Sequence, residues 1–142
     1  MRKFFIFCLA LAFVFSSVFV VGASENNPFP DTDISTIEGR AAAYLFDAGV
    51  IDGYPDGEFK GEREVNRAEL TKFLLLAAGE TVSGEKNDGR FSDLEENSWY
   101  VEFVIRAEEL NIVDGYDDGT FRPANSVNTA EFIKMATNTF GL

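Results

Sequence analysis

The sequence Asp52-Gly-Tyr-Pro-Asp-Gly-Glu-Phe59 returns 62 residues later as Asp114-Gly-Tyr-Asp-Asp-Gly-Thr-Phe121. At the same spacing, residues 29–79 match residues 91–141 without a gap, and 14 positions are identical. Average residue usage would give roughly three identities. A repeat of this length is typical of a supersecondary unit that buries its apolar face by stacking on further copies. The sequence therefore predicts two copies of one unit, copy one (29–79) and copy two (91–141).

The chain begins with a segment that has the form of a secretory signal. The basic pair Arg2-Lys3 precedes an apolar run at residues 4–21, and small residues follow it, so we expect cleavage after Ala23. The alternative is an uncleaved membrane anchor, because the 18 residues of the run lie near the lower limit for spanning a bilayer. Both interpretations place the rest of the chain outside the cytoplasm. Cys8 lies in the run, so the expected mature chain contains no cysteine.

Composition excludes several kinds of chemistry. The chain has no histidine, and without cysteine the mature part can form neither disulfides nor a zinc site of the His or Cys type. After cleavage, ten basic and 24 acidic residues would remain, a formal charge of −14 on 119 residues. That charge disfavours nucleic acid and anionic lipid as partners. We expect one domain, with a polar entry segment at residues 24–28 and a linker at residues 80–90 between the copies.

Each copy is predicted to form a helix, a turn-rich loop and a second helix. Ser35-x-x-Glu38 has the form of a capping box at the start of the first helix. Asn66 and Asn128 are predicted N-caps of the second helices, with Glu69 and Glu131 as acidic residues in the first turn, and Gly79 and Gly141 are expected to end these helices. The aspartates and glycines of the loop between the helices indicate tight turns, some with positive φ.

Apolar residues recur at helical spacing in all four expected helices. We expect one buried stripe on each helix and a core shared by all four helices. The stripes are Ile37, Ala41, Leu45 and Ala48; Leu70, Phe73, Leu74, Ala77 and Ala78; Trp99, Phe103, Ala107 and Leu110; and Phe132, Met135, Ala136, Thr139 and Phe140.

These motifs, in this order, resemble the S-layer homology domain of bacterial cell-surface proteins. The family pattern has an F-x-D opening, here Phe29-Pro-Asp31 and Phe91-Ser-Asp93, followed by the G-Y-x-D-G-x-F loop. A V-T-R-A-E stretch then begins the second helix, here Val65-Asn-Arg-Ala-Glu69 and Val127-Asn-Thr-Ala-Glu131. The resemblance implies an all-α fold of tandem helix-loop-helix repeats around a shared core. Family members commonly assemble three repeats with a groove at each junction, whereas this chain has two.

The resemblance implies a secreted, non-catalytic module at the cell wall or S-layer. It would need no cofactor and would bind secondary cell-wall polysaccharide, often pyruvylated, or a polymer linked to peptidoglycan. Self-association or pairing with other chains of the family is a further expectation, as is the possibility that the sequence is the anchoring part of a longer protein. No membrane contact is expected after signal cleavage.

The candidate ligand-binding residues are the arginine of the family motif and the residues around it in both copies. Arg67 near a helix start would offer a fixed cation and backbone amides to an acidic sugar. The alternative is a surface arginine paired with Glu64 or Glu69. Trp99 could stack on a sugar, or pack in the core as part of its stripe. The full candidate set is Asn66, Arg67, Glu69, Asp56 and Gly57 in copy one, with Thr129, Asp118, Gly119 and Trp99 in copy two.

Two other classes of function are weaker. In a calcium loop that begins at Asp52 or Asp114, the required glutamate at position twelve is replaced by Arg63 or Asn125. A glycosidase would need a paired acid and base, and nothing among the 24 acidic residues singles out such a pair.

Overall fold

The computed structural model describes residues 26–142 and divides into two compact units. Unit 1 contains residues 26–48 and 53–59, and unit 2 contains residues 49–52 and 60–142. The predicted signal sequence and its cleavage site lie outside the described residues. Within the described part, the regular elements are α-helices, which confirms the predicted all-α fold. None of these helices has the length and apolarity that crossing a membrane requires.

Unit 1 contains the first helix of copy one, α2 (Ile37–Asp47). Its N-cap is Thr36, whose hydroxyl accepts the Gly39 N–H at 3.0 Å, so the capping box predicted from Ser35 is wrong. The reason is a local turn, in which the Asp33 carboxylate accepts the Ser35 N–H at 2.8 Å. The helix therefore begins one residue later than expected. Phe29 is buried and packs its ring against Phe46 and Phe59.

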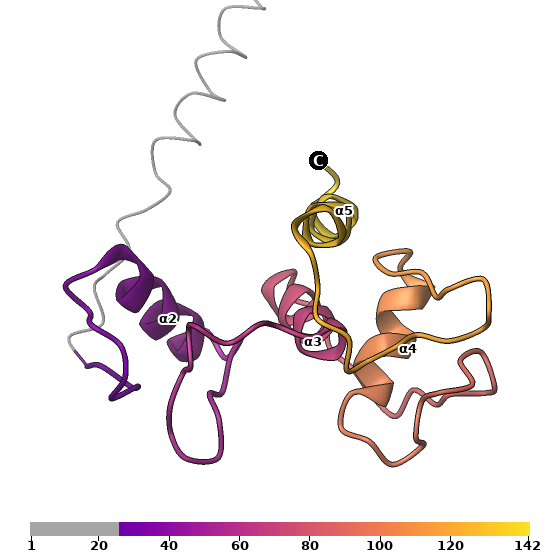
Figure 1. The fold of residues 1–142 in the computed structure, drawn as a ribbon, viewed down its shortest axis with the longest axis horizontal. Coiled ribbons are helices and arrows are strands. Elements are labelled where there is room, and N and C mark those ends of the chain that lie inside the picture. Colours follow the sequence, from indigo (N-terminus) through magenta and orange to yellow (C-terminus); the bar gives the residue numbers. More distant parts are fainter. Residues whose placement is uncertain (1–25) are drawn as a thin grey trace, which may run out of the picture. The chain divides into compact units, whose positions relative to one another are not determined.

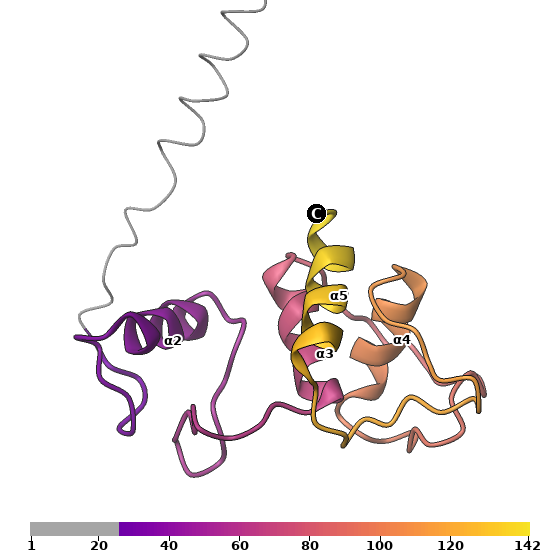
Figure 2. The ribbon, with the colours of Figure 1, turned by 45° about the horizontal axis from the view of Figure 1, so that its top comes forward.

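Unit 2 contains the second helix of copy one, α3 (Arg67–Ala77), together with both helices of copy two, α4 (Val101–Glu109) and α5 (Thr129–Phe140). Helix α3 packs against both α4 and α5, as Figures 1 and 2 show. The core of this unit draws on α3, on α4, on the loop of copy two and on Met135 of α5; its largest fully buried side chains are Leu74, Leu75, Val104, Ile105 and Phe121. The expected shared core thus includes three of the four helices, and α2 belongs to the other unit.

The predicted ends of α3 and α5 are confirmed. Asn66 and Asn128 each form a complete capping box with the glutamate three residues later. After α3, Gly79 adopts φ 77°, and the Glu80 N–H reaches back to the Leu75 carbonyl at 3.0 Å. This arrangement is a Schellman motif, which satisfies carbonyls that the helix leaves without partners.

The predicted stripes on the first helices are only partly right, since Ala107 of α4 is buried and Phe103 and Leu110 pack against the core. In α4 the buried residues are Val101, Val104, Ile105 and Ala107, whereas Trp99 precedes the helix and is 54% exposed. In α2 the equivalent positions hold the buried Gly39, Ala42 and Ala43, whereas Ile37 is exposed. In α2 the alanines Ala41, Ala42 and Ala43 are consecutive, so the apolar residues alone did not decide which face is buried. The small residues of α2 fit a close approach, since a Cβ at Gly39 would meet the backbone of Asp33.

The F-x-D opening of copy two holds the end of its loop. Asp93 accepts two backbone N–H groups, from Phe121 through Oδ1 and from Arg122 through Oδ2, both at 2.7 Å. The Phe91 ring contacts Phe121 and covers Gly115, where a Cβ would collide with that ring. Gly115 is therefore required by close packing, and not by the positive φ that we expected of the loop glycines.

We predict that Asp93→Ala lowers the free energy of unfolding by about 2–3 kcal/mol, since two backbone donors lose their acceptor beside the buried Phe121. Urea denaturation followed by circular dichroism measures the change. Asp93→Asn is the matched control, because it keeps one acceptor oxygen and should lose about half as much. Equal losses in both variants would contradict this account of the aspartate.

Candidate functional site

The starts of the two second helices pair with each other in unit 2. The Arg67 N–H donates to the Asn125 carbonyl at 2.9 Å, and the Ala68 N–H donates to the Pro123 carbonyl at 3.1 Å. In return, the Val127 N–H donates to the Val65 carbonyl at 3.0 Å. The first amides of α3 are thus occupied by copy two. The expectation that they would be available to a ligand is wrong, because the repeat junction uses them.

Arg67 extends from the start of α3 into the loop of copy two. Its Nε donates to the Phe121 carbonyl at 3.0 Å and its Nη2 donates to the Asp114 carbonyl at 3.1 Å. The guanidinium also lies over the rings of Tyr116 and Phe121, at 5.0 and 4.7 Å from their centroids. Its Nη1 lies 3.7 Å from the Glu131 carboxylate, and the side chain is only 7% exposed.

A buried guanidinium is costly unless it is paired and hydrogen-bonded, and Arg67 meets both conditions. It is therefore neither the surface arginine of the alternative interpretation nor an open anion receptor. It fixes the loop of copy two on the helix of copy one. Among the described residues, every buried side-chain nitrogen and oxygen has a hydrogen-bond partner.

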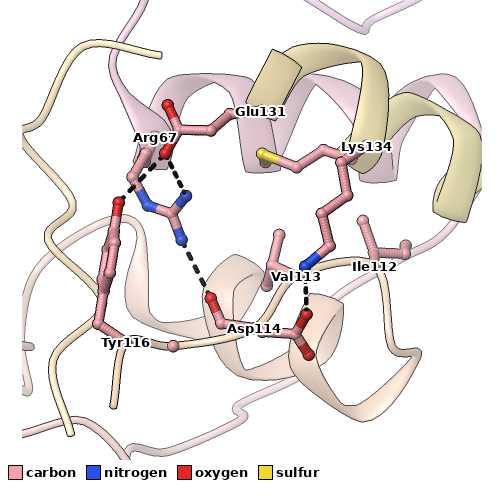
Figure 3. Close-up of a pocket in the computed structure, with 9 residues that line it drawn as sticks. Arg67, Ile112, Val113, Asp114, Tyr116, Glu131 and Lys134 are labelled. Atoms are coloured by element: carbon pink, nitrogen blue, oxygen red, sulfur yellow. Dashed lines mark hydrogen bonds and ion pairs between the residues drawn. The ribbon is translucent and has the colours of Figure 1, made fainter. Parts of the chain in front are cut away.

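A small pocket opens beside the guanidinium (Figure 3). Its volume is about 150 Å³, and its wall combines an apolar side with a charged rim. The lining residues are Arg67, Ile112, Val113, Asp114, Gly115, Tyr116, Glu131, Lys134 and Met135. The rim is electrically balanced, with two cations and two carboxylates. Such a site suits a small polar group with directed hydrogen bonds better than a highly charged one.

Lys134 is the most accessible cation of the pocket. Its Nζ lies 2.8 Å from the Asp114 carboxylate, and its side chain is 64% exposed. The equivalent Lys72 makes the same pair with Asp52 at 2.7 Å but is only 28% exposed. Two rings lie beside Lys72, with its Nζ 5.9 Å from the Trp99 centroid and 5.7 Å from the Phe103 centroid. The two lysines are thus chemically equivalent, and only Lys134 is open to a ligand.

The other candidate residues of copy one lie in two places. Asn66 and Glu69 are occupied with each other in the capping box, and Glu69 also pairs with Arg63 at 3.1 Å. Asp56 and Gly57 belong to the loop of unit 1, where the Asp56 carboxylate accepts the Glu58 N–H at 3.2 Å.

The candidates of copy two do not line the pocket. Thr129 is the first residue of α5 and is exposed. Asp118 and Gly119 lie at the exposed tip of the loop. Trp99 packs its edge against Tyr100, with ring centroids 5.5 Å apart, and leaves much of its face open. The interpretation of Trp99 as a core residue is therefore wrong.

The prediction missed Tyr116, Asp114 and Glu131 as partners of Arg67. All three are identical in the two copies, and we had assigned such positions to turns and caps. One contact of this loop could have been found from the sequence, because the pair Asp52 and Lys72 recurs at the same spacing as Asp114 and Lys134. A paired acid and base that recur in this way indicate a contact between loop and helix.

The acidic loop tip is held by side chains of the protein. Hydrogen bonds from Thr120 and from the Arg122 guanidinium lower the pKa of Asp118 to about 2. The Arg122 Nη2 lies 2.8 Å from the Asp118 Oδ2. No group of three or more acidic, histidine or cysteine side chains suited to a metal ion occurs in the part of the chain that the structure describes.

Comparison with known proteins identifies the family. The family model of the S-layer homology domain matches residues 28–71 and 90–133. The cellulosome-anchoring protein of Acetivibrio thermocellus is 38% identical to the chain over 77% of its length. The surface-layer 125 kDa protein of Lysinibacillus sphaericus is 30% identical over 99% of it, and S-layer protein EA1 of Bacillus anthracis is 26% identical over 84%.

The chain spans only 24%, 12% and 14% of the lengths of these three relatives, respectively. The resemblance therefore concerns the repeats and not the remainder of those proteins. It confirms the family that the two motif sets indicated. The chain belongs to the S-layer homology domain family, and its two repeats are the part that it shares with these cell-surface proteins.

Proposed function

We propose that the module anchors by binding a cell-wall polysaccharide, and that the pocket beside Arg67 and Lys134 receives one acidic sugar unit. The observation that carries this proposal is the exposed Lys134, which stands on the rim of a pocket with an apolar wall. A sugar presents both a polar edge and an apolar face, so it can use both parts of such a pocket. The names of relatives, such as the middle cell wall protein of Brevibacillus brevis, support a wall component as the ligand.

The equal number of cations and carboxylates on the rim determines how an acidic sugar would bind. A ligand carboxylate, such as that of a pyruvyl group, would bind the Lys134 ammonium in place of the Asp114 carboxylate. Charge-assisted hydrogen bonds of this kind contribute about 1.5–3 kcal/mol each. Arg67 lies beside this position and holds the loop in place through its hydrogen bonds.

The acidity of the whole chain limits the mode of recognition. A formal charge of −12 repels an anionic polymer at long range, and salt screens that repulsion. Binding therefore depends on contacts inside the pocket. Unlike attachment to a basic surface, it should weaken little between low and physiological salt.

We predict that Lys134→Ala reduces binding to purified bacterial cell walls about tenfold or more, which corresponds to the loss of one charge-assisted hydrogen bond. Co-sedimentation with walls from Lysinibacillus sphaericus measures the effect. Walls stripped of their secondary polysaccharide should retain neither the parent chain nor the variant.

Lys72→Ala is the matched control for this prediction, because it removes the same charge from the equivalent position, where the lysine is covered. It should bind intact walls like the parent chain. Binding that survives both Lys134→Ala and removal of the polysaccharide would disprove the proposed function.

Arg67→Ala tests the other half of the proposal, namely that Arg67 acts by holding the loop. We predict a loss of about 3 kcal/mol in the free energy of unfolding, since two carbonyls and Glu131 lose a buried partner. Thermal and urea denaturation measure it. Full stability together with lost wall binding would instead make Arg67 a direct ligand of the glycan.

We further predict that calcium and EDTA leave the melting temperature and wall binding unchanged. Asp118 is held by Thr120 and Arg122, and Asp114 is paired with Lys134, so these carboxylates are already occupied. Differential scanning calorimetry with and without millimolar calcium is the test. A rise in melting temperature that EDTA reverses would support the calcium alternative.

A further inference from the structure

The two second helices differ in how far they are covered. On α3, Leu70 and Thr71 are buried in the core that α3 shares with α4. The equivalent residues of α5 are Phe132 and Ile133, which are 46% and 57% exposed. Both are larger apolar residues than water-facing helix positions usually carry. The face of α5 that corresponds to the covered face of α3 is therefore apolar and open.

Backbone groups at the same end of α5 are also open. At the observed junction, the first two amides of α3 donate to carbonyls of the segment 123–125. The equivalent amides of α5 belong to Thr129 and Ala130, and neither has a hydrogen-bond partner within the described residues. The start of α5 thus has the donors of a second junction, and nothing in the described chain accepts from them.

Copy one carries the surface that would complete such a junction. At the observed junction, Glu80 follows α3 and forms an ion pair with Arg106 of α4, at 2.9 Å. The positions equivalent to Glu80 and Arg106 are Leu142 and Tyr44, and both are exposed, Leu142 by 88%. The ion pair of Glu80 and Arg106 thus corresponds to two apolar residues, Leu142 and Tyr44. Leu142 follows α5 and Tyr44 lies on α2, so the two side chains can contact each other only where an α2 packs against an α5.

More of α2 agrees with this match. Ile37, which is equivalent to Trp99 at the observed junction, is 74% exposed, and Phe46 is 41% exposed. In copy two the residues equivalent to Tyr44 and Phe46 are Arg106 and Glu108, both charged. The first helix of copy one therefore exposes apolar side chains where its counterpart in copy two exposes charges.

We propose that a second copy of this chain covers α5 with its α2, in the way that α4 covers α3. The contact joins two different surfaces, because the end of copy two in one chain meets copy one of another. In the proposed dimer each chain contributes both surfaces, so the contact occurs twice and covers both apolar faces. This proposal does not depend on which ligand the pocket binds.

The test uses the exported chain, recovered from a bacterial secretion host with its N-terminus verified by mass spectrometry. Sedimentation equilibrium should show a reversible, concentration-dependent dimer. Ile133→Glu should weaken the dimer at least tenfold while the helical content stays that of the parent, because this side chain is exposed in the single chain. Thr81→Glu adds the same charge at an exposed linker position and should leave dimerisation unchanged.

A charge exchange tests which surfaces meet. Leu142→Glu and Tyr44→Arg should each weaken the dimer, whereas the double variant should restore it by recreating the ion pair of Glu80 and Arg106. A single monomeric species at all concentrations would overturn the proposal. So would a dimer that Ile133→Glu leaves intact, or a double variant no better than the single ones.

Discussion

The structure of unit 2 depends on the burial of the Arg67 guanidinium. A charge removed from water must find partners, and Arg67 finds them in the carbonyls of Asp114 and Phe121, in the carboxylate of Glu131 and in two aromatic rings. These partners all belong to copy two, whereas the arginine belongs to copy one. The same contact orders the loop, joins the two copies and forms the base of the pocket.

The repeat predicted the local structure well because local structure depends on nearby residues. The caps at Asn66 and Asn128 and the glycine ends of the second helices follow from side chains within four positions. The buried faces of the first helices followed only in part. Trp99 and Val101 both lie on plausible apolar faces, and the choice between them is made by α3, which is distant in sequence.

The sequence singled out Arg67 as a ligand-binding candidate, whereas the structure buries it at the junction of the two copies. Its partners could not be assigned, since a comparison of two copies does not show whether a residue contacts its own copy or the next. Lys134 and Lys72 occupy equivalent positions, but the rings of Trp99 and Phe103 lie beside Lys72 and leave it less exposed. Accessibility of this kind is a property of the junction and is invisible in the repeat pattern.

Because Arg67 of copy one contacts the loop of copy two, the repeat in the sequence and the unit that forms the pocket have different boundaries. The unit that is duplicated in the sequence runs from one F-x-D opening to the glycine after the second helix. The unit that carries the pocket runs from the second helix of one copy to the second helix of the next. Gain or loss of a whole duplicated segment therefore changes the number of junctions. Whether a new junction contains the buried arginine depends on which copy is duplicated, because copy two carries Thr129 at that position.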